Sequence, residues 1–541
     1  MKPLTTWDPE NAAFWDSEGK AVARRNLWIS IPNLLCAFAV WIFWSVIVVM
    51  IQRLHDTNPT LFAFPDANGN APTGDAYRAM LYTLPAIAGL AGATLRIPNS
   101  FMIALAGGRT VITLTTALLI LPALGVGLAL RDPNTSFNLL VAMAVLSGVG
   151  GGAFASSMSN ISFFFPKRVQ GTSLGLNAGL GNVGVSVMQV LIPLAVTVGI
   201  FGGAGYQVAL QGGGMATTFP ENAGLVWAPI LAFLAIAAWL GMTNLPAHRA
   251  HSTAVGFARV AWLELLGFIA AGVGAALMLL DWGGVPQMVQ MLAILLVTVV
   301  LTLVLMRWVT PKGTRDRLVT QFAIFRNKHN WIMTWLYVMT FGSFIGFSAA
   351  FPKLIVDVFG YIRVDAAGNP LAEVIRNPHG PNALAFAWLG PLVGSLIRPV
   401  GGWLSDKFGG ARVTHWDTLL MIGATIGVAY FVVAARNSAT PEDHFVPFLI
   451  LFLILFVTTG IGNGSTFRMI PIIFKPEQAG PVLGWTSAVA AYGAFLVPGI
   501  FGMQIKAGFP EYAFYGFAVY YVSCLALNWW FYARRGAATP C

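Results

Sequence analysis

Fourteen long apolar segments, separated by short polar loops, dominate the sequence. Each supplies about 20 mostly apolar residues, and a helix rising ~1.5 Å per residue would carry them across a ~30 Å hydrocarbon layer. With 57% hydrophobic and 10% charged residues, the chain has too little polar surface for a soluble globular fold. We therefore predict an all-α polytopic membrane protein with spans at 27–52, 78–106, 108–130, 136–165, 168–200, 224–244, 258–280, 286–307, 330–358, 383–406, 413–435, 445–474, 479–505 and 511–533.

The loops fall into two sets by charge, and these sets predict the orientation. Lys and Arg gather in segments such as 20–25, 167–168, 307–328 and 534–535, whereas Asp and Glu dominate the alternate loops. Because basic loops stay in the cytoplasm, both termini are predicted to be cytoplasmic, which requires an even number of spans. The same clustering accounts for the formal net charge of +10 without a nucleic-acid partner.

The two ends of the chain repeat the same order of features. Arg96 is followed eleven residues later by glycines 107–108, and Arg398 eleven residues later by glycines 409–410. Each half then carries a glycine cluster, an aromatic–proline loop and a glycine pair. In the first half these lie at 148–152, 165–167 and Gly171/Gly175. In the second half they lie at 460–464, 474–476 and Gly480/Gly484. Parallel repeats of this kind characterise major-facilitator transporters, which hold substrate between their halves near the midplane.

The predicted fold is accordingly a major facilitator fold of two pseudo-symmetric six-helix halves with an inserted two-helix hairpin. Residues 1–26 are polar and are predicted to be cytoplasmic rather than a cleaved signal, because the first apolar run is long enough to span. The expected domains are the segment 1–26, an N-terminal half at 27–244, the hairpin with a basic cytoplasmic linker at 245–329, and a C-terminal half with a short cytoplasmic tail at 330–541.

A glycine-rich stretch, 148–189, joins two of the predicted spans. Gly171, Gly175 and Gly179 follow one another at four-residue steps, the spacing at which membrane helices approach closely. Asn177, Asn182 and Gln189 lie among or just after them as neutral hydrogen-bonding side chains. We expect these two helices to wall a narrow polar passage, with the glycines letting neighbouring helices slide.

Arg96 and Arg398 are the residues that most strongly indicate a binding site. Each lies eleven residues from a predicted cytoplasmic loop, which corresponds to a depth of roughly 16 Å. An arginine at the midplane costs at least ~3 kcal/mol, so it should face a cavity and bind something. The twelve spans outside the insert carry no Asp or Glu at that depth. An anion carrier is therefore favoured over a buried ion pair.

Neighbouring aromatic residues narrow the choice of anion. A guanidinium group is planar and donates in a fork, which suits planar oxyanions and carboxylates. Phe154, Tyr337 and Phe341 are predicted near the same depth, and Tyr337 and Phe341 share one helix face. Aromatic walls favour a flat, weakly hydrated anion over phosphate. For each ring alone, ordinary helix packing remains the alternative.

Several segments resemble the NarK-type nitrate/nitrite porters of the major facilitator superfamily. They are ATLRIPNSFM at 93–102, the stretch 148–189, TFGSFIGFSA at 340–349, GPLVGSLIRPVGGWLSDKFGGARVT at 390–414 and GIGNGSTFRMIP at 460–471. The resemblance implies nitrate between Arg96 and Arg398, sandwiched by Phe154 and Phe341 and contacted by Asn182 and Tyr337. The sequence departs from the family pattern at Ala178, where some members have glycine, and in the inserted hairpin, which the basic twelve-helix plan lacks.

Other charged residues are assigned weaker roles. The segment GGWLSDKFGGAR at 401–412 resembles the superfamily's cytoplasmic loop motif, in which Asp406 would pair with Arg412 and latch one conformation; a solvated loop is the alternative. Glu264 is expected to be a helix-end carboxylate that reaches the interface, with a proton site as the alternative. Arg468 is expected near the cytoplasmic end of its helix, either attracting anions or simply solvated.

The predicted function is exchange of external nitrate for internal nitrite by alternating access. Two unpaired arginines should hinder closure around an empty site, and an anion in either direction would relieve their repulsion. Proton-coupled nitrate symport is the main alternative. A drug exporter with fourteen helices is disfavoured because such carriers use membrane-embedded acids, and a nitrate sensor would need a larger cytoplasmic output domain than 1–26 or 534–541.

No enzyme activity, cofactor or metal is expected. Cys36, Cys524 and Cys541 lack the spacing of a metal site or a disulfide framework. The predicted partners are nitrate, nitrite and the lipid bilayer, and the protein is expected to work as a monomer in the bacterial cytoplasmic (inner) membrane.

Overall fold

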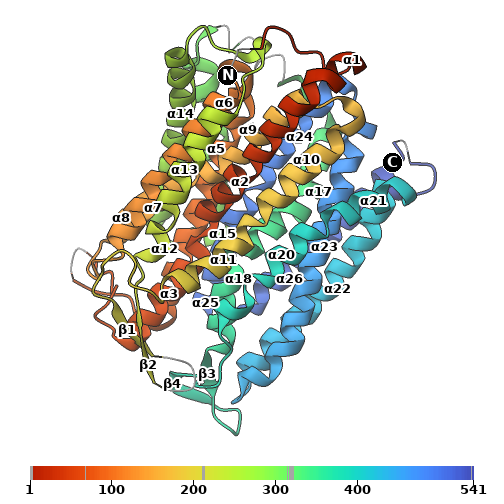
Figure 1. Cartoon of the computed structure of the whole chain (residues 1–541). Helices are drawn as coiled ribbons and strands as arrows, with labels where there is room; N and C mark the ends of the chain where they lie inside the picture. Colours follow the sequence, from red (N-terminus) through yellow and green to blue (C-terminus); the bar gives the residue numbers. More distant parts are fainter. Residues whose placement is uncertain (1–3, 67–68, 210–213, 313–314, 316–321, 538) are drawn as a thin grey trace.

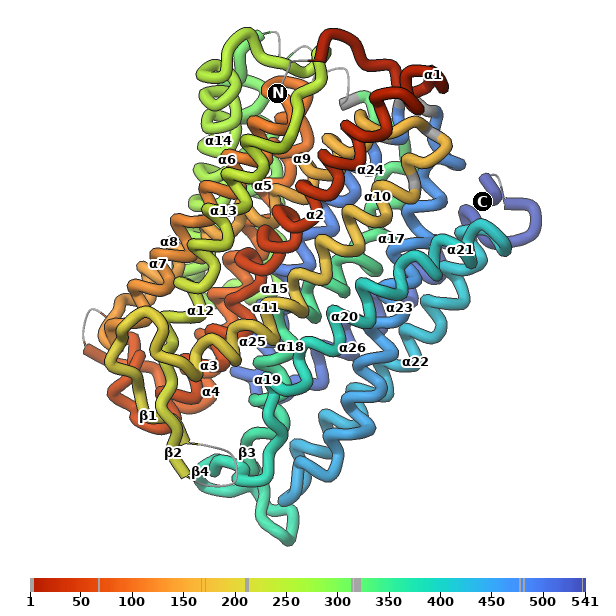
Figure 2. The backbone as a smooth tube through the Cα atoms, in the orientation of Figure 1, coloured from red at the N-terminus to blue at the C-terminus, as the bar shows by residue number. Residues whose placement is uncertain are grey.

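A computed structural model describes residues 4–66, 69–209, 214–312, 315, 322–537 and 539–541. The chain is a bundle of long helices with two short β-hairpins (Figure 1). Both termini lie toward one end of the bundle and all four strands at the other (Figures 1 and 2). We call these the terminal end and the strand end; the charge distribution predicts that the terminal end is cytoplasmic.

The N-terminal half follows the predicted order of spans, several of them broken into two helices. Its first two spans are joined at the strand end by a loop, and its last two by the hairpin β1–β2, in which Tyr206 pairs with Thr218. The elements are α1 (Ala12–Phe14), η1 (Trp15–Gly19), α2 (Lys20–Ile42), α3 (Trp44–Thr57), α4 (Gly74–Leu81), α5 (Thr83–Ala106), α6 (Gly108–Leu118), α7 (Ile120–Ala129), α8 (Phe137–Ser147), α9 (Val149–Phe164), α10 (Lys167–Asn182), α11 (Gly184–Ala195), β1 (Tyr206–Ala209), β2 (Met215–Thr218), α12 (Asn222–Leu225) and α13 (Trp227–Gly241).

The rest of the chain contains the inserted hairpin and the C-terminal half. A second strand-end hairpin, β3–β4, follows the first span of this half, with Tyr361 opposite Arg376. The elements are η2 (Pro246–His248), α14 (Thr253–Leu279), α15 (Gln287–Trp308), η3 (Phe322–Arg326), α17 (Lys328–Tyr337), η4 (Val338–Gly342), α18 (Ser343–Phe359), β3 (Tyr361–Val364), β4 (Pro370–Arg376), α19 (Ala383–Phe386), α20 (Leu389–Leu396), α21 (Arg398–Phe408), α22 (Gly410–Arg436), η5 (Pro441–His444), α23 (Phe445–Ile473), α24 (Pro476–Ala490), α25 (Gly493–Ala507), α26 (Glu511–Asn528) and η6 (Trp529–Ala533).

The described part of the chain contains 13 helices long and apolar enough to cross a membrane. They match the first thirteen predicted spans, and the expectation of an all-α multi-span membrane protein is confirmed. The fourteenth predicted span, 511–533, does form a helix, α26, which packs on α22. Its many tyrosines and its polar ends, Glu511 and Asn528, make it less apolar than the others.

The inserted hairpin packs mainly on the N-terminal half. Helix α14 runs along α5, and a side chain at Gly267 would come within 2.5 Å of Leu95. Helix α15 contacts α5 as well as α25 of the C-terminal half, where Met291 lies against Gly499. The hairpin thus lies beside a junction between the two halves.

Candidate functional site

Arg96 lies in the middle of α5 and is fully buried. Its Nε donates to the carbonyl of Gly151 on α9 at 3.1 Å, and its Nη1 donates to the carbonyl of Ser487 on α24 at 3.1 Å. The third nitrogen, Nη2, is buried without a hydrogen-bond partner. Two carbonyls from opposite halves therefore fix the guanidinium group and leave one strong donor free.

Arg398 is the first residue of α21 and lies against the same aromatic ring as Arg96. The distances from the guanidinium carbons to the Phe341 ring centroid are 5.2 Å for Arg96 and 5.5 Å for Arg398. The Nη2 of Arg398 is also buried without a partner. The two groups are near enough to repel each other electrostatically. The structure thus brings together the two arginines that the repeat indicated.

Phe341 belongs to η4, a π-helical turn that interrupts the first span of the C-terminal half. Such turns often occur at functional sites, because the wider turn changes the direction of the side chains that follow. Phe341 stacks on Phe154 of α9 with centroids 6.2 Å apart, and on Tyr337 at 5.6 Å. The Phe154 ring lies 4.7 Å from the Arg96 guanidinium carbon. Three predicted aromatic residues therefore surround the arginines.

Tyr337 and Asn182 supply further hydrogen-bonding groups that the protein does not satisfy. The Tyr337 hydroxyl is buried without a hydrogen-bond partner and interacts electrostatically with both arginines. Both polar atoms of the Asn182 side chain are buried and unpartnered at the end of α10. A buried group left without a partner costs about 1–3 kcal/mol. A ligand beside the arginines could supply the partner that the Tyr337 hydroxyl lacks, and a contact of Asn182 with that ligand stays a prediction.

Asn463 is a residue that the sequence analysis missed. Its side-chain nitrogen and oxygen are both buried without partners in α23. In the repeat, the cluster 460–464 aligns with 148–152, so Asn463 corresponds to Gly151, whose carbonyl holds Arg96. The signal in the sequence was an asparagine at a position where the matching glycine cluster of the first half has glycine.

The predicted glycine stripe packs differently from our expectation. A side chain at Gly175 or Gly179 would meet nothing within 4 Å, so this face of α10 borders open space instead of another helix. The surroundings of Gly171 lie outside the described residues. Close approach occurs elsewhere in the stretch, for example at Gly184, where a Cβ would come within 2.0 Å of the Leu35 carbonyl oxygen. Whether the stripe closes at another stage of the cycle stays a prediction.

The loop latch also has a different partner. Asp406 forms an ion pair with Arg468 of α23, and both side chains are exposed. The predicted pairing of Asp406 with Arg412 is therefore wrong in this conformation. Arg412 lies next to the C-terminal tail, whose last residue, Cys541, accepts a hydrogen bond from the Ala411 N–H. A latch role for Asp406 stays a prediction.

Two carboxyl groups within the spans, those of Glu264 and Asp417, are buried. Glu264 lies eleven residues from the start of α14 and is 2% exposed, so it is not a carboxylate that reaches the interface. Its Oε1 accepts a hydrogen bond from Asn99 Nδ2 at 2.8 Å, while Oε2 is buried without a partner. Asp417 lies seven residues into α22 and also has a buried, unpartnered oxygen.

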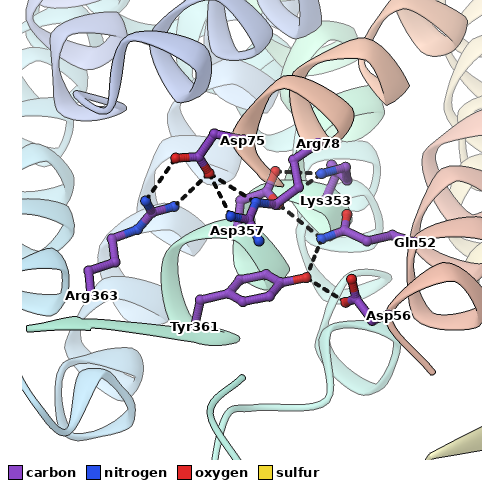
Figure 3. Close-up of polar contacts among 8 residues, drawn as sticks. All are labelled: Gln52, Asp56, Asp75, Arg78, Lys353, Asp357, Tyr361 and Arg363. Carbon is purple, nitrogen blue, oxygen red and sulfur yellow. Dashed lines mark hydrogen bonds and ion pairs between the residues drawn. The ribbon is translucent and has the colours of Figure 1, made fainter. Parts of the chain in front are cut away.

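At the strand end, a polar network links the two halves (Figure 3). Gln52 of α3 donates to the Tyr361 hydroxyl at 2.7 Å and to Asp357 at 3.3 Å. The Tyr361 hydroxyl in turn donates to Asp56 of α3. Asp357 belongs to α18, where it pairs with Lys353. One amide of the N-terminal half therefore contacts both α18 and β3.

A second part of the network is centred on Asp75 of α4. Arg363 of β3 donates to both Asp75 oxygens, at 3.2 and 3.3 Å, and Arg78 donates to Asp75 at 2.9 Å (Figure 3). The Arg78 guanidinium carbon also lies 4.1 Å from the Tyr361 ring centroid. The strand end is thus held closed by direct contacts, while Gly175 and Gly179 border open space on α10.

Known proteins resemble the chain over nearly its whole length. No family model matches it. The nitrate/nitrite transporter NarU of Escherichia coli is 34% identical, covering 98% of this chain and 96% of that protein. A probable nitrate/nitrite antiporter of Thermus thermophilus, NarK2, is 35% identical, covering 99% and 98%. Among solved structures, a POT family transporter in complex with 5-aminolevulinic acid matches with a TM-score of 0.55 and 14% identity over 92% of this chain and 94% of that one, which shows the major facilitator fold.

Proposed function

We propose that this chain, which belongs to the NarK-type family of nitrate/nitrite transporters, exchanges nitrate for nitrite across a bacterial cytoplasmic membrane. The observation that carries the proposal is the pair Arg96 and Arg398. They lie on different halves, against one aromatic ring, and each keeps a buried donor without an acceptor. A small anion between the halves would supply the acceptors.

The shape of the site favours a planar oxyanion. Nitrate and nitrite offer oxygens in one plane, which suits the in-plane donors of guanidinium groups. The Phe154 and Phe341 rings would cover the faces of the anion, and the Tyr337 hydroxyl would donate to its edge. Asn182 is proposed to contact the same edge. Each hydrogen bond that the anion accepts from one of these two charged, unpartnered donors would stabilise the complex by about 1.5–3 kcal/mol.

Repulsion between the arginines supports exchange over free uptake. The guanidinium carbons lie 5.2 and 5.5 Å from the same Phe341 centroid, so they are at most about 11 Å apart. Two unit charges at that distance repel by about 1.5 kcal/mol or more at an effective dielectric constant of ~20. An empty carrier would meet this cost whenever its halves close, whereas a bound anion offsets it. Return of the empty carrier is then slow, and net movement requires an anion in each direction. Opening toward the strand end also requires the network around Asp75 and Gln52 to break.

A proton-coupled nitrate symporter is the second candidate, and two observations favour it. Glu264 and Asp417 are buried carboxyl groups within the spans, which the sequence analysis had not expected outside a helix end. A buried, incompletely paired carboxyl group is a suitable proton carrier. We favour exchange because neither carboxyl group contacts the two arginines directly.

Counterflow in proteoliposomes separates the candidates. Vesicles containing the purified protein are preloaded with nitrite, and uptake of labelled nitrate is compared with that into empty vesicles carrying an inward proton gradient. Exchange predicts rapid uptake only with internal nitrite. Uptake into empty vesicles that follows the proton gradient would establish symport instead. Vesicles containing the Arg96→Lys variant serve as the matched control, because the variant keeps the charge but loses the forked donor.

The same proposal includes the setting of the protein. The protein is a multi-pass membrane protein with the terminal end in the cytoplasm, and it functions as a monomer with nitrate and nitrite as its small-molecule partners. Chemical cross-linking in vesicles, with transport measured at decreasing protein-to-lipid ratio, tests the monomer: activity per molecule should not change on dilution.

A further inference from the structure

Glu264 lies at about the same depth as Arg96. It is eleven residues from the terminal-end start of α14, and Arg96 is ten residues from the terminal-end end of α5. Because the two helices pack side by side, the carboxyl group and the guanidinium group belong to one layer of the bundle. The inserted hairpin therefore brings an ionisable group to the level of the proposed anion site.

Asn99 connects Glu264 to the helices that hold Arg96. Its Nδ2 donates to Glu264 at 2.8 Å and to the Leu95 carbonyl at 3.0 Å. The same nitrogen lies against Gly152, where a Cβ would approach it to 2.7 Å. Gly152 directly follows Gly151, the residue whose carbonyl accepts from Arg96. The carboxyl group of Glu264 thus ends a chain of contacts that begins at Arg96.

The surroundings of Glu264 favour its neutral form. Val260 and Leu263 flank it on α14 and pack with Met102 and Ile103 of α5 in one apolar cluster. Because Oε2 has no partner, a carboxylate there would be an isolated buried charge, and such groups take up a proton instead.

Few charged groups compete for this proton. Among the helices packed with α14, the charged side chains are Arg96 on α5, Arg109 on α6 and Arg307 on α15, with Arg259 on α14 itself and none on α8. Arg109 is the second residue of α6 and Arg307 the next to last of α15, both at the terminal end. Arg259 lies five residues before Glu264 on α14, and its Nη1 donates to the Leu105 carbonyl at 2.9 Å. Among these charges, Arg96 is the one at the depth of Glu264 on a helix packed against α14.

We propose that Glu264 binds a proton and that its protonation state sets the anion affinity of the site at Arg96. The inference rests on the proposed nitrate/nitrite exchange. With the proton bound, Glu264 is neutral and Arg96 attracts the anion fully. After the proton leaves, a negative charge on the order of 10 Å from the site repels the anion, and at an effective dielectric constant of ~20 this weakens binding about tenfold. Nitrate KM should therefore rise as pH increases.

The test is nitrate/nitrite counterflow at graded nitrate concentrations in acidic through alkaline buffers. The wild-type KM for nitrate is expected to rise about tenfold toward alkaline pH. Glu264→Gln keeps a neutral side chain of the same shape, so its KM should stay at the low, acidic value throughout. Asp417→Asn, which removes the buried carboxyl group of the other half, should keep the wild-type pH profile.

A second variant keeps the test decisive if Glu264→Gln does not fold. Asn99→Leu removes the hydrogen bond that stabilises the carboxylate, so the rise in KM should move to more alkaline buffers. A Glu264→Gln profile equal to wild type, or a flat profile in Asp417→Asn, overturns the proposal. If the wild-type protein does not transport nitrate at any pH, the proposed function itself fails. If it transports nitrate with a pH-independent KM, only the role of Glu264 fails.

Discussion

Removing the carboxylate of Asp357 should open the strand end. Lys353 Nζ lies 2.8 and 2.6 Å from the two Asp357 oxygens, and both side chains are 0% exposed. Breaking a buried ion pair by removing one partner typically costs 3–5 kcal/mol, because an uncompensated charge remains in a low-dielectric site. In Asp357→Asn, this cost destabilises the conformation in which the strand end is closed. Once the strand end opens, water reaches Lys353 and most of the cost disappears.

The expected magnitude follows from this difference. If about 3 kcal/mol separates the buried from the hydrated state of Lys353, the ratio of closed to open molecules falls about a hundredfold. Double electron–electron resonance between spin labels at Thr60→Cys and Ala366→Cys, in a background lacking the native cysteines, measures the change. These two positions are exposed at the strand end, one in each half. Asp357→Asn should shift the distance distribution toward longer values.

Two further variants test whether the unpaired charge of Lys353 causes the opening. Glu373→Gln removes an exposed carboxylate from β4 at the same end, and its distances should match those of the wild type. Lys353→Met combined with Asp357→Asn removes both charges, so the closed distribution should return. Unchanged distances in Asp357→Asn, or a double variant as open as the single one, would refute the electrostatic explanation.

Three further predictions concern the site. Arg96→Lys and Arg398→Lys should each weaken nitrate binding roughly 10–100-fold in titration calorimetry, because lysine cannot reproduce the forked donor; near-normal binding would exclude that arginine. Asn463→Ala loses no hydrogen bond, so it should lower the free energy of unfolding by only about 1 kcal/mol, but it should reduce nitrate uptake. Gly179→Ala should fold normally but slow transport if the glycine stripe closes during the cycle, and fast transport by this variant would contradict a sliding role. Gly184→Ala should instead lower the melting temperature, because its Cβ would clash with a carbonyl.

Sequence reasoning identified the arginines and rings because their signals are local. An arginine far from any loop is costly wherever it lies, and the repeat shows that the two arginines occupy equivalent places. Tyr337 and Phe341 are one turn apart, so their common face followed from helix geometry. These residues needed only the depth and the period of a helix, both of which the sequence contains.

The contacts that escaped prediction depend on how helices meet. Glu264 was misplaced because the span was expected to begin at 258, whereas α14 begins at Thr253, which moves the carboxyl group a turn and a half deeper. The partner of Glu264 then depends on the register of α14 against α5, which no local pattern specifies. The network around Asp75 joins residues nearly three hundred positions apart. The spacing of Gly175 and Gly179 indicates that a close approach is possible, but not at which stage it occurs.

The position of the inserted hairpin has a consequence for the lipid around the protein. Met306 of α15 packs with Ile97 of α5 and Ala488 of α24, so one seam between the rocking halves is covered by protein. Because the hairpin packs mainly on the N-terminal half, the C-terminal half would move along that seam against side chains of α15 and not against acyl chains. Changes in bilayer thickness cost fractions of a kcal/mol per Å at surfaces that lipids touch, so they should act mainly through the opposite, uncovered seam. The carrier would then respond to the thickness of its membrane mainly at one of the two seams.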